Sequence, residues 1–387
     1  MKFFIKIRLK HLIIVGFFLR LITCLIYYWG FAPYELKPIV QNQYQGIGTD
    51  GYFQIARTLW LSGEYAFEVG GQPVHSRPPL QPLLLLITSA WSDHYWFFQW
   101  FIVSSLLGTT AIFLVYQLTI RFSNVQNALC ASAMVAFHPY LVIIARSTTF
   151  VHLGTVLLLA TFYIYFHYKY SLTKYILLGF FCGLCLLTHG TFQILPLSFA
   201  ILLAYKKKFF EAILVIIFTL MTVFPWTIRN YFTFQKPIFL VTGMGMQFWK
   251  GEESAFRSKV DIYRKVYEEN TGKKLQIAYF CTIDPEDDQL LWKLGLKKIG
   301  DKPFEFIQRF LYGIIIFLFP HETGWQKFIF TFLCNFPLFL AAILKPKKYW
   351  QKEIALYLAL VILVFAFFTP HAGYIVMFLP LITLFLV

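Results

Sequence analysis

An aspartate at the start of a short amphipathic pattern is the first candidate for chemistry. Asp50 precedes apolar residues at helical spacing, and Gly63 ends the pattern. The pattern predicts a helix along a membrane surface, entered at Thr49 and Asp50. A carboxylate held there can act as a general base on a hydroxyl group. It can also cap the helix, and the local pattern alone favours the cap because Asp is a preferred N-cap residue.

Two arginines lie at positions where a positive charge calls for an explanation. Arg77 precedes Pro78 and Pro79, which lack backbone N–H groups and stiffen the chain around it. A guanidinium fixed in this way suits a phosphate group, which it can bind with two parallel hydrogen bonds, and it equally suits a lipid headgroup. Arg20 lies inside an apolar segment, where we expect it to be paired or to face a watery cavity.

Histidines and cysteines in the apolar segments have simpler explanations. His138, His152 and His189 lie near the ends of apolar segments, where we expect polar packing rather than metal binding. Cys182 and Cys185 form a CxxC inside an apolar run that lacks other metal-ligating side chains. We interpret these two cysteines as small buried hydrophobic residues.

An acidic run in the second half of the chain has the features of a helix start. Asp284 is followed by Pro285 and by acidic residues at 286–288. Asp is a preferred cap, proline is tolerated in the first turn, and negative charge is favourable at the positive end of the helix dipole. We therefore assign the run to a helix N-terminus and not to a metal site.

The composition is that of a membrane protein. Of the 387 residues, 58% are hydrophobic and 14% are charged, whereas a soluble chain has about a quarter charged residues. We expect the lipid bilayer as a partner. The net charge of +15 does not indicate nucleic acid, because lysine and arginine collect in the cytoplasmic loops of membrane proteins. The basic start leads into a long apolar stretch without a small-residue cleavage site, which predicts a retained first span.

Apolar segments long enough to cross a bilayer recur along the chain. Clear spans are expected at 11–30, 96–120, 127–145, 150–168, 209–226, 327–344 and 353–369. Residues 174–205 hold two shorter spans broken around Thr188-His189-Gly190, and a last one runs from about Tyr374 to Val387. The segments Leu80–Trp91 and Phe304–Pro320 are short or interrupted, and each follows a proline.

The distribution of lysine decides how the two short segments are treated. If both are re-entrant or lie at the outer interface, Lys206–Lys208 and Lys345–Lys348 share one face with the basic N-terminus. If both cross the membrane, Lys206–Lys208 moves to the other face. We therefore predict an all-α protein of about ten transmembrane helices, a single domain over 1–387, with a cytoplasmic N-terminus. Its two large extracytoplasmic loops are 31–95 and 227–326.

Several stretches, taken in order, resemble the GT-C glycosyltransferases that use polyprenyl-phosphate sugars. This group includes protein O-mannosyltransferases and the aminoarabinose transferase of lipid A. The stretches are TDGYFQIARTLWLSGEY, SRPPLQPLLLL, GFFCGLCLLTHGTF, FPWTIRNYFTFQKPIFLVTGMGMQFWKGEE, DKPFEFIQRFL and PHAGYIVMFLPLI. The match covers essentially the whole chain, and the order of the stretches carries it more than any one of them.

The resemblance implies an inverting transferase that moves a hexose or pentose from a polyprenyl-phosphate carrier to a hydroxyl of a glycan, lipid or protein. The reaction would take place on the extracytoplasmic side of the plasma membrane. The family's catalytic acid falls on Asp50, and with that context we favour Asp50 as the base. The implied substrate-binding residues are Tyr52, Arg77, Arg229, Lys250, His371 and Tyr374. No cofactor is certain, and a divalent cation beside the donor phosphate is left open.

The chain departs from the family at three places. Gly51 follows Asp50 where many relatives have a second acid, and Thr188-His189-Gly190 stands where they often have Thr-Arg-Pro. The stretch ARSTTFVH lacks the carboxylate that relatives often carry in their second outer loop. Two other functions stay open. A flippase or transporter of polyprenyl-linked sugars would need the cations but no base, and an inactive relative would bind a donor without turnover.

Overall fold

The computed structural model describes residues 8–35, 51–92, 95–248, 268–269, 272, 285–318, 349–368 and 376–386. Helices make up nearly all of these residues, and within them the only β-structure is an isolated bridge between Ala66 and Pro73. The predicted all-α class is therefore confirmed. The predicted span at 327–344 and the loop lysines Lys345–Lys348 lie outside the described residues.

Helices account for most of the described residues. They are α1 (Leu9–Glu35), α2 (Tyr52–Ser62), α3 (Leu80–Leu85), α4 (Trp96–Ile120), α5 (Val125–Phe137), α6 (Pro139–Ile143), α7 (Val151–His167), α8 (Leu172–Thr188), α9 (Ile194–Tyr205), α10 (Phe209–Phe234), α13 (Pro285–Asp301), α14 (Pro303–Leu318), α16 (Tyr349–Phe367) and α17 (Leu379–Thr383). Short π- or 3₁₀-segments lie at η2 (Leu86–Ala90), η3 (Ile144–Arg146), η4 (Gly190–Gln193) and η7 (Leu384–Leu386).

Several of these helices are long and apolar enough to cross a membrane. Within the described residues they are α1 over Leu9–Trp29, α4, α10, and α16 over Trp350–Phe367. The pair formed by α5 with the following helix to Arg146 passes the same test, but it is bent by 55°. The chain is therefore a multi-pass membrane protein, and the count of about ten crossings stays a prediction.

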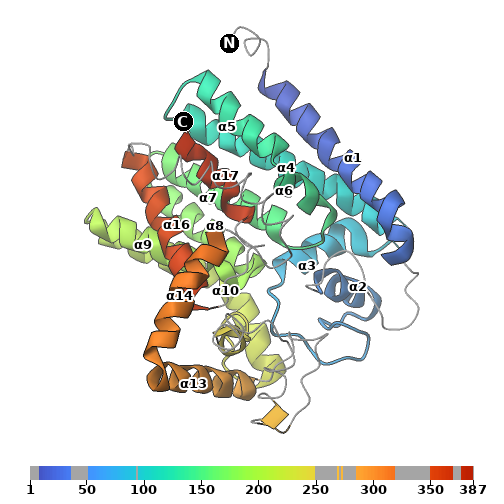
Figure 1. The fold of residues 1–387 in the computed structure, drawn as a ribbon, viewed down its shortest axis with the longest axis vertical. Coiled ribbons are helices and arrows are strands. Elements are labelled where there is room, and N and C mark those ends of the chain that lie inside the picture. Colours follow the sequence, from blue (N-terminus) through green and yellow to red (C-terminus); the bar gives the residue numbers. More distant parts are fainter. Residues whose placement is uncertain are drawn as a thin grey trace.

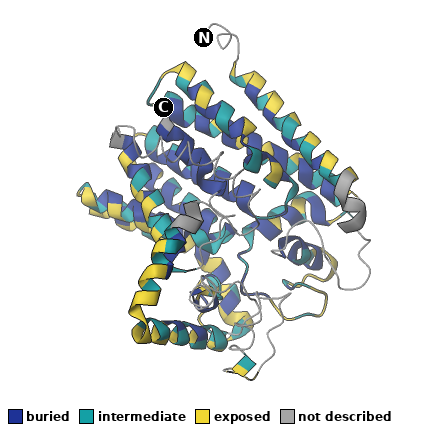
Figure 2. Ribbon diagram, in the orientation of Figure 1, coloured by how far each residue is buried: buried dark blue, intermediate teal, exposed yellow. Residues whose placement is uncertain are grey.

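The two faces of α1 show which environment these helices meet. Ile14, Phe18, Ile22 and Ile26 follow every fourth residue and are 50–62% exposed. Leu12, Gly16, Arg20 and Cys24 follow the same spacing and are buried. Residues four apart share one helix face, so one apolar face of α1 looks outward and the face that holds Arg20 is buried. Figure 2 shows exposed and buried residues alternating along α1. Such an arrangement suits lipid rather than water.

A break between α5 and α6 explains how Arg20 is buried. Pro139 has no N–H, so the carbonyl of Val135 lacks the donor that a continuous helix would supply four residues later. Arg20 supplies it, because Nη2 donates to Val135 O at 2.9 Å and Nη1 donates to Ala136 O at 3.2 Å. Gly108 leaves the necessary space, since a Cβ there would lie 2.5 Å from Arg20 Nε. The expectation that Arg20 is paired is confirmed, and the span expected at 127–145 is a helix pair with a bend at its break.

Arg309 of α14 repeats this arrangement at the end of α16. Its guanidinium donates to the carbonyl oxygens of Ala366, Phe367 and Phe368 at 3.0–3.1 Å, and the side chain is 1% exposed. The last carbonyls of a helix have no partners within it and carry partial negative charge, so a buried cation satisfies both needs. In each case a charged residue from an apolar helix closes the C-terminus of its neighbour.

The helices α7, α8, α9 and α10 form the part of the bundle that supports the candidate site. α8 packs between α7 and α10, and α9 packs against α10 and α16. Helix α13 lies across one end of the molecule, the end that also carries α2 and the loop 63–79 (Figure 1). The described part of the last predicted span, 376–386, is short and buried against α4, α5 and α7.

Candidate functional site

The loop between α2 and α3 is folded back on itself and fixes the backbone of Arg77. Val74 N–H donates to the carbonyl of Tyr65 at 2.9 Å. The Tyr65 hydroxyl lies 3.1 Å from the carbonyl oxygens of both Arg77 and Pro78, which share its proton. Burial raises the pKa of Tyr65 far above its ordinary value, so the hydroxyl stays a donor. One buried tyrosine thus clamps the proline-rich turn that carries Arg77.

Arg229 reaches the same loop from the end of α10. The sequence analysis placed it in an outer loop that begins at residue 227; in the structure α10 continues as a helix to Phe234 with Pro225 inside it. Its Nη1 donates to Val74 O at 2.9 Å and to Asn230 Oδ1 at 3.1 Å. The guanidinium carbon lies 4.8–5.2 Å from the ring centres of Tyr65, Trp226 and Phe234.

Tyr52 completes the group of predicted site residues that the described part of the chain contains. It is the first residue of α2 and is 1% exposed, and the Arg77 guanidinium carbon lies 5.6 Å from its ring centre. The structure therefore brings Arg77 and Arg229 to Tyr65, which the sequence analysis had not singled out, and places Tyr52 beside Arg77. Asp50, Lys250, His371 and Tyr374 lie outside the described residues.

The residue next to Asp50 has a backbone conformation that explains one departure from the family. Gly51 has φ 76° and is the N-cap of α2, so the helix begins after the Thr49–Asp50 entry that the sequence predicted. A Cβ at this position would lie 2.3 Å from the ring of Phe67. A second acid after Asp50 would therefore need both a strained backbone and a displaced aromatic ring.

His189 packs beside these residues, in the connection between α8 and η4. Its ring stacks on Phe150 with 3.8 Å between centres, and Phe150 meets the Tyr52 ring edge to face at 6.1 Å. Thr191 N–H donates to His189 Nδ1 at 3.2 Å, which places the proton of the neutral ring on Nε2. Burial, and then the charge of Arg77, lower the pKa of His189 to about 3. The ring is therefore neutral at physiological pH.

Residues 238–242, which follow α10 and are called here the strip, lie between the residues around Tyr65 and an apolar cavity. Trp226 Nε1 donates to the carbonyl of Leu240 at 2.7 Å, and Asn230 Nδ2 lies 3.3 Å from the same oxygen. His75 Nδ1 forms a short hydrogen bond with Thr242 Oγ1, and Thr242 N–H donates to the His75 carbonyl at 3.2 Å. The strip is therefore held on one side by the end of α10 and on the other by the loop of Arg77.

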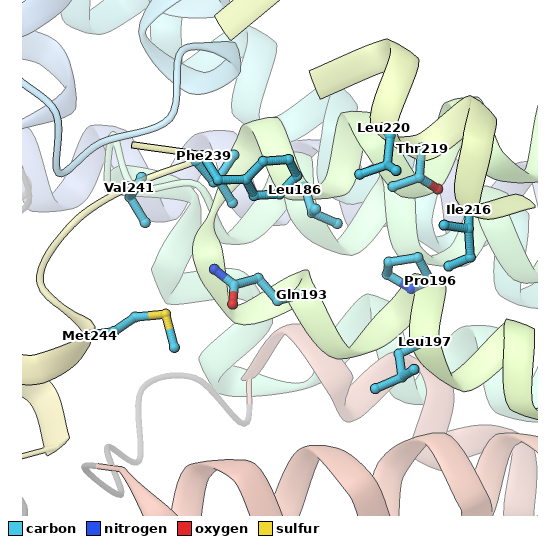
Figure 3. A pocket seen from close by; sticks show the side chains of 11 residues that line it. Leu186, Gln193, Pro196, Leu197, Ile216, Thr219, Leu220, Phe239, Val241 and Met244 are labelled. Carbon is cyan, nitrogen blue, oxygen red and sulfur yellow. The ribbon is translucent and has the colours of Figure 1, made fainter. Parts of the chain in front are cut away.

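An apolar cavity of about 340 Å³ lies on the other side of this strip (Figure 3). Its walls come from α8, η4, α9, α10 and the strip itself: Leu186, Gln193, Pro196, Leu197, Ile216, Thr219, Leu220, Phe239, Leu240, Val241 and Met244. Leu240 belongs to both regions, since its carbonyl binds Trp226 while the residue lines the cavity. The size is in the range of small-ligand sites, and the lining suits a hydrocarbon chain.

Asp288 anchors α13 to the chain just beyond the strip. Its two carboxylate oxygens accept hydrogen bonds from the N–H groups of Gly243 at 3.1 Å and Met246 at 2.8 Å. The predicted helix start is confirmed for the described residues, because α13 begins at Pro285 with Asp288 in its acidic first turn, while Asp284 lies outside them. Within the described residues, no three His, Cys, Asp or Glu side chains are grouped to hold a metal ion.

Comparisons with known proteins give a fold and no close relative. No family model and no curated protein matches the sequence. The oligosaccharyltransferase of Archaeoglobus fulgidus in its apo form matches with a TM-score of 0.57 and 13% identity, over 100% of this chain and 51% of that one. The archaeal oligosaccharyltransferase AglB from Archaeoglobus fulgidus, in complex with an inhibitory peptide and a dolichol-phosphate, matches with a TM-score of 0.55 and 14% identity.

That second match covers 99% of this chain and 50% of AglB, so the chain spans about half the length of these solved structures. ArnT from Cupriavidus metallidurans bound to undecaprenyl phosphate aligns more loosely, with a TM-score of 0.43 and 13% identity over 95% of this chain and 77% of that one. At these identities the likeness to AglB establishes architecture. The GT-C fold that the sequence resemblance predicted is therefore the fold of this chain.

Proposed function

We propose that this chain is a membrane glycosyltransferase that takes a sugar from a polyprenyl-phosphate carrier and transfers it, with inversion, to an acceptor hydroxyl. The observation that carries the proposal is the position of Arg77 and Arg229 around Tyr65, next to the strip that lines an apolar cavity. A lipid-linked phosphate needs this combination of a cation and a place for hydrocarbon. The fold shared with a transferase solved with a dolichol-phosphate supports the same donor class.

The two guanidiniums would serve different purposes. Arg229 gives Nη1 to Val74 and Asn230, so part of its donor capacity maintains the loop. Arg77 lies in a turn whose backbone Tyr65 holds; its guanidinium lies over the Tyr52 ring, and its Nη1 donates to the carbonyl of Ser76 at 3.2 Å. As in the sequence analysis, we assign the donor phosphate first to Arg77, then to Arg229, with Lys250 as the third candidate.

The reaction would form one bond and break one. The acceptor oxygen attacks the anomeric carbon, the bond from that carbon to the phosphate oxygen breaks, and the acceptor proton passes to Asp50. The phosphate leaves with an added negative charge, which Arg77 stabilises. We place this chemistry on the extracytoplasmic side of the plasma membrane, as the lysine distribution predicts. Tyr52, His371 and Tyr374 remain proposed substrate contacts, and a divalent cation beside the phosphate is compatible with this scheme but not required by it.

The test is sugar transfer by the purified chain in nanodiscs, supplied with radiolabelled polyprenyl-phosphate sugars. Mass spectrometry of glycolipids and glycoproteins from cells with and without the protein identifies the acceptor class. We expect Asp50→Asn to bind donor normally and to transfer roughly 10²–10⁴-fold more slowly, because the general base is lost. Glu64→Gln is the matched control, since Glu64 lies in the same loop and hydrogen-bonds Ser62 and Gly70.

The alternative functions give different outcomes in the same experiment. A flippase of polyprenyl-linked sugars would move labelled donor across the bilayer with equal rates in wild type and Asp50→Asn. A catalytically inactive relative would bind donor and transfer no sugar with any acceptor tried. Transfer at the wild-type rate by Asp50→Asn would remove Asp50 from the mechanism.

A further inference from the structure

A second concentration of positive charge lies at the other end of α8 from His189. The helix has 17 residues, so its two ends are about 25 Å apart at 1.5 Å per residue. Lys174 lies in its first turns, and Lys206, Lys207 and Lys208 form the connection between α9 and α10. These four residues, called here the lysine corner, play no part in the proposed transfer reaction.

Two ammonium groups of the lysine corner share one aromatic ring. Lys208 Nζ lies 3.3 Å from the ring centre of Tyr170, and Lys174 Nζ lies 4.8 Å from the same centre. Lys174 is only 4% exposed and also faces the rings of Tyr165 and Tyr175 at 5.1 and 5.9 Å. In the described part of the chain neither ammonium forms a salt bridge, so the rings and the more distant carboxylate of Glu353 offset their mutual repulsion.

The acids near the lysine corner leave it strongly positive. Glu353 of α16 is bound to Lys206, which also donates to the Tyr165 hydroxyl at 2.8 Å. Glu211 lies in the first turn of α10. Both α8 and α10 begin here, so the positive ends of two helix dipoles add to the lysines, and the N-cap of α10 makes no side-chain hydrogen bond. An anion placed between Lys174 and Lys208 would be favoured by these lysines and by both helix N-termini.

The surroundings of the lysine corner indicate where such an anion would come from. Tyr205 is 85% exposed, Tyr170 71%, Phe210 66% and Phe209 63%. Exposed aromatic rings beside lysines are typical of the level of lipid headgroups, where an amphipathic ring meets both hydrocarbon and water. A soluble anion would gain nothing from these rings, whereas the acyl chains of a lipid would cover them.

We propose that the lysine corner is a binding site for the phosphate group of an anionic phospholipid, separate from the donor site. The phosphate lies against Lys174 and Lys208, and the acyl chains pack on Phe209 and Phe210. The predicted cytoplasmic position of Lys206–Lys208 agrees with this ligand, because anionic lipids give the cytoplasmic leaflet its negative surface potential. The proposal does not depend on the transfer reaction, since none of these residues belongs to the donor site.

Native mass spectrometry and lipid exchange into nanodiscs test the proposal with phosphatidylglycerol as the probe and phosphatidylcholine as the neutral reference. The double variant Lys174→Gln, Lys208→Gln should bind phosphatidylglycerol about 30-fold more weakly, at about 1 kcal/mol for each lysine near a membrane surface. The matched control is Lys293→Gln, Lys297→Gln, which removes two exposed lysines from α13 and should leave binding unchanged.

A second variant and a second ligand separate the remaining outcomes of this experiment. Because Lys174 is buried, Lys208→Glu alone is a second variant that alters a partly exposed residue and should also weaken binding; circular dichroism and the melting temperature confirm that it is folded. Inorganic phosphate in detergent separates the two sources of the anion. The proposal would be overturned if the lysine-corner and α13 variants bound phosphatidylglycerol equally well. It would also be overturned if inorganic phosphate stabilised the protein against thermal unfolding as strongly as the lipid does. Donor binding at the Arg77 site should be unaffected in all these variants.

Discussion

Tyr65 contacts both of the predicted arginines, each in a different way. Its ring lies under Arg229 and its hydroxyl holds the carbonyls of the turn that carries Arg77. The Arg229 guanidinium therefore binds the loop at Val74, whereas Arg77 belongs to a turn whose backbone Tyr65 holds. The sequence analysis selected both arginines as candidates but could not separate their roles, because the hydrogen bond from Arg229 to Val74 joins distant parts of the chain.

The difference between the two arginines is open to measurement. Arg77→Ala should weaken binding of a polyprenyl phosphate by about 1.5–3 kcal/mol, the range for a hydrogen bond to a charged group, with little change in melting temperature. Arg77→Lys should recover part of the loss, because lysine keeps the charge but cannot form the two parallel hydrogen bonds of a guanidinium. Arg229→Ala should instead lower the melting temperature, since it leaves Val74 O without its donor. Equal donor affinity of Arg77→Ala and wild type would reduce Arg77 to a headgroup contact.

The neutral state of His189 predicts a pH dependence of stability. Its pKa is lowered to about 3 in the folded protein by burial and by Arg77, while the unfolded chain has the ordinary value near 6.5. Below pH 6.5 the unfolded state therefore binds more protons, and the contribution of His189 to stability falls as pH decreases from 6.5 toward 3. The melting temperature of His189→Gln should fall less between pH 6.5 and 4.5 than that of wild type. Parallel curves for the two proteins would contradict the buried, neutral ring.

Gly51 gives a test of the backbone beside the proposed base. Gly51→Ala should lower the free energy of unfolding by about 1–3 kcal/mol, because φ is 76° and the added Cβ meets Phe67. The double variant Gly51→Ala, Phe67→Leu removes the contact and keeps the strained φ, so it should recover part of the loss. Chemical denaturation in detergent measures both effects. Gly63→Ala is a comparison at a similar φ of 74° with open space around it.

At the scale of helices, apolar length and flanking charge predicted most elements well and missed what happens where they break. The helix from Trp96 to Ile120 was predicted at the same residues, and Gly63 does end α2. The bend at Pro139 and the extension of α10 past Pro225 were not predicted, because proline breaks one helix and is tolerated in another. What decides between them is the neighbouring structure. Arg20 supplies the donor missing at the first break, and no local pattern records that contact.

The closure of a helix end by Arg20 can be tested directly. Arg20→Met fills a similar volume but leaves Val135 O and Ala136 O buried without a donor, so it should cost about 3 kcal/mol of stability. Thermal unfolding in detergent measures the change. Lys10→Met is the control, because Lys10 is an exposed cation on the same helix. A melting temperature of Arg20→Met equal to that of wild type would show that the carbonyls at the end of α5 find other partners.

At the scale of the whole molecule, the fold was predicted more completely than the site. The apolar segments and the order of motifs identified a GT-C membrane protein, and the structure has that fold. The candidate site was predicted in its residue types, and its packing was not. The strip of residues 238–242, the cavity beneath it and the anchoring of α13 through Asp288 all depend on contacts between distant parts of the chain. Spacing along the sequence carries no record of such contacts.

The orientation in the membrane is the property of the whole chain on which the proposed chemistry depends. The lysines of the α9–α10 connection are predicted to face the cytoplasm and α13 to face outward, because short basic loops remain inside. Lys207 and Lys297 are both exposed, which makes them matched labelling positions. In a background without native cysteines, Lys297→Cys should react with a membrane-impermeant maleimide in intact cells, and Lys207→Cys should react only after permeabilisation. Labelling of both positions from the same side would mean that one of the short segments Leu80–Trp91 or Phe304–Pro320 crosses the membrane, and would move the Arg77 site relative to the lysine corner.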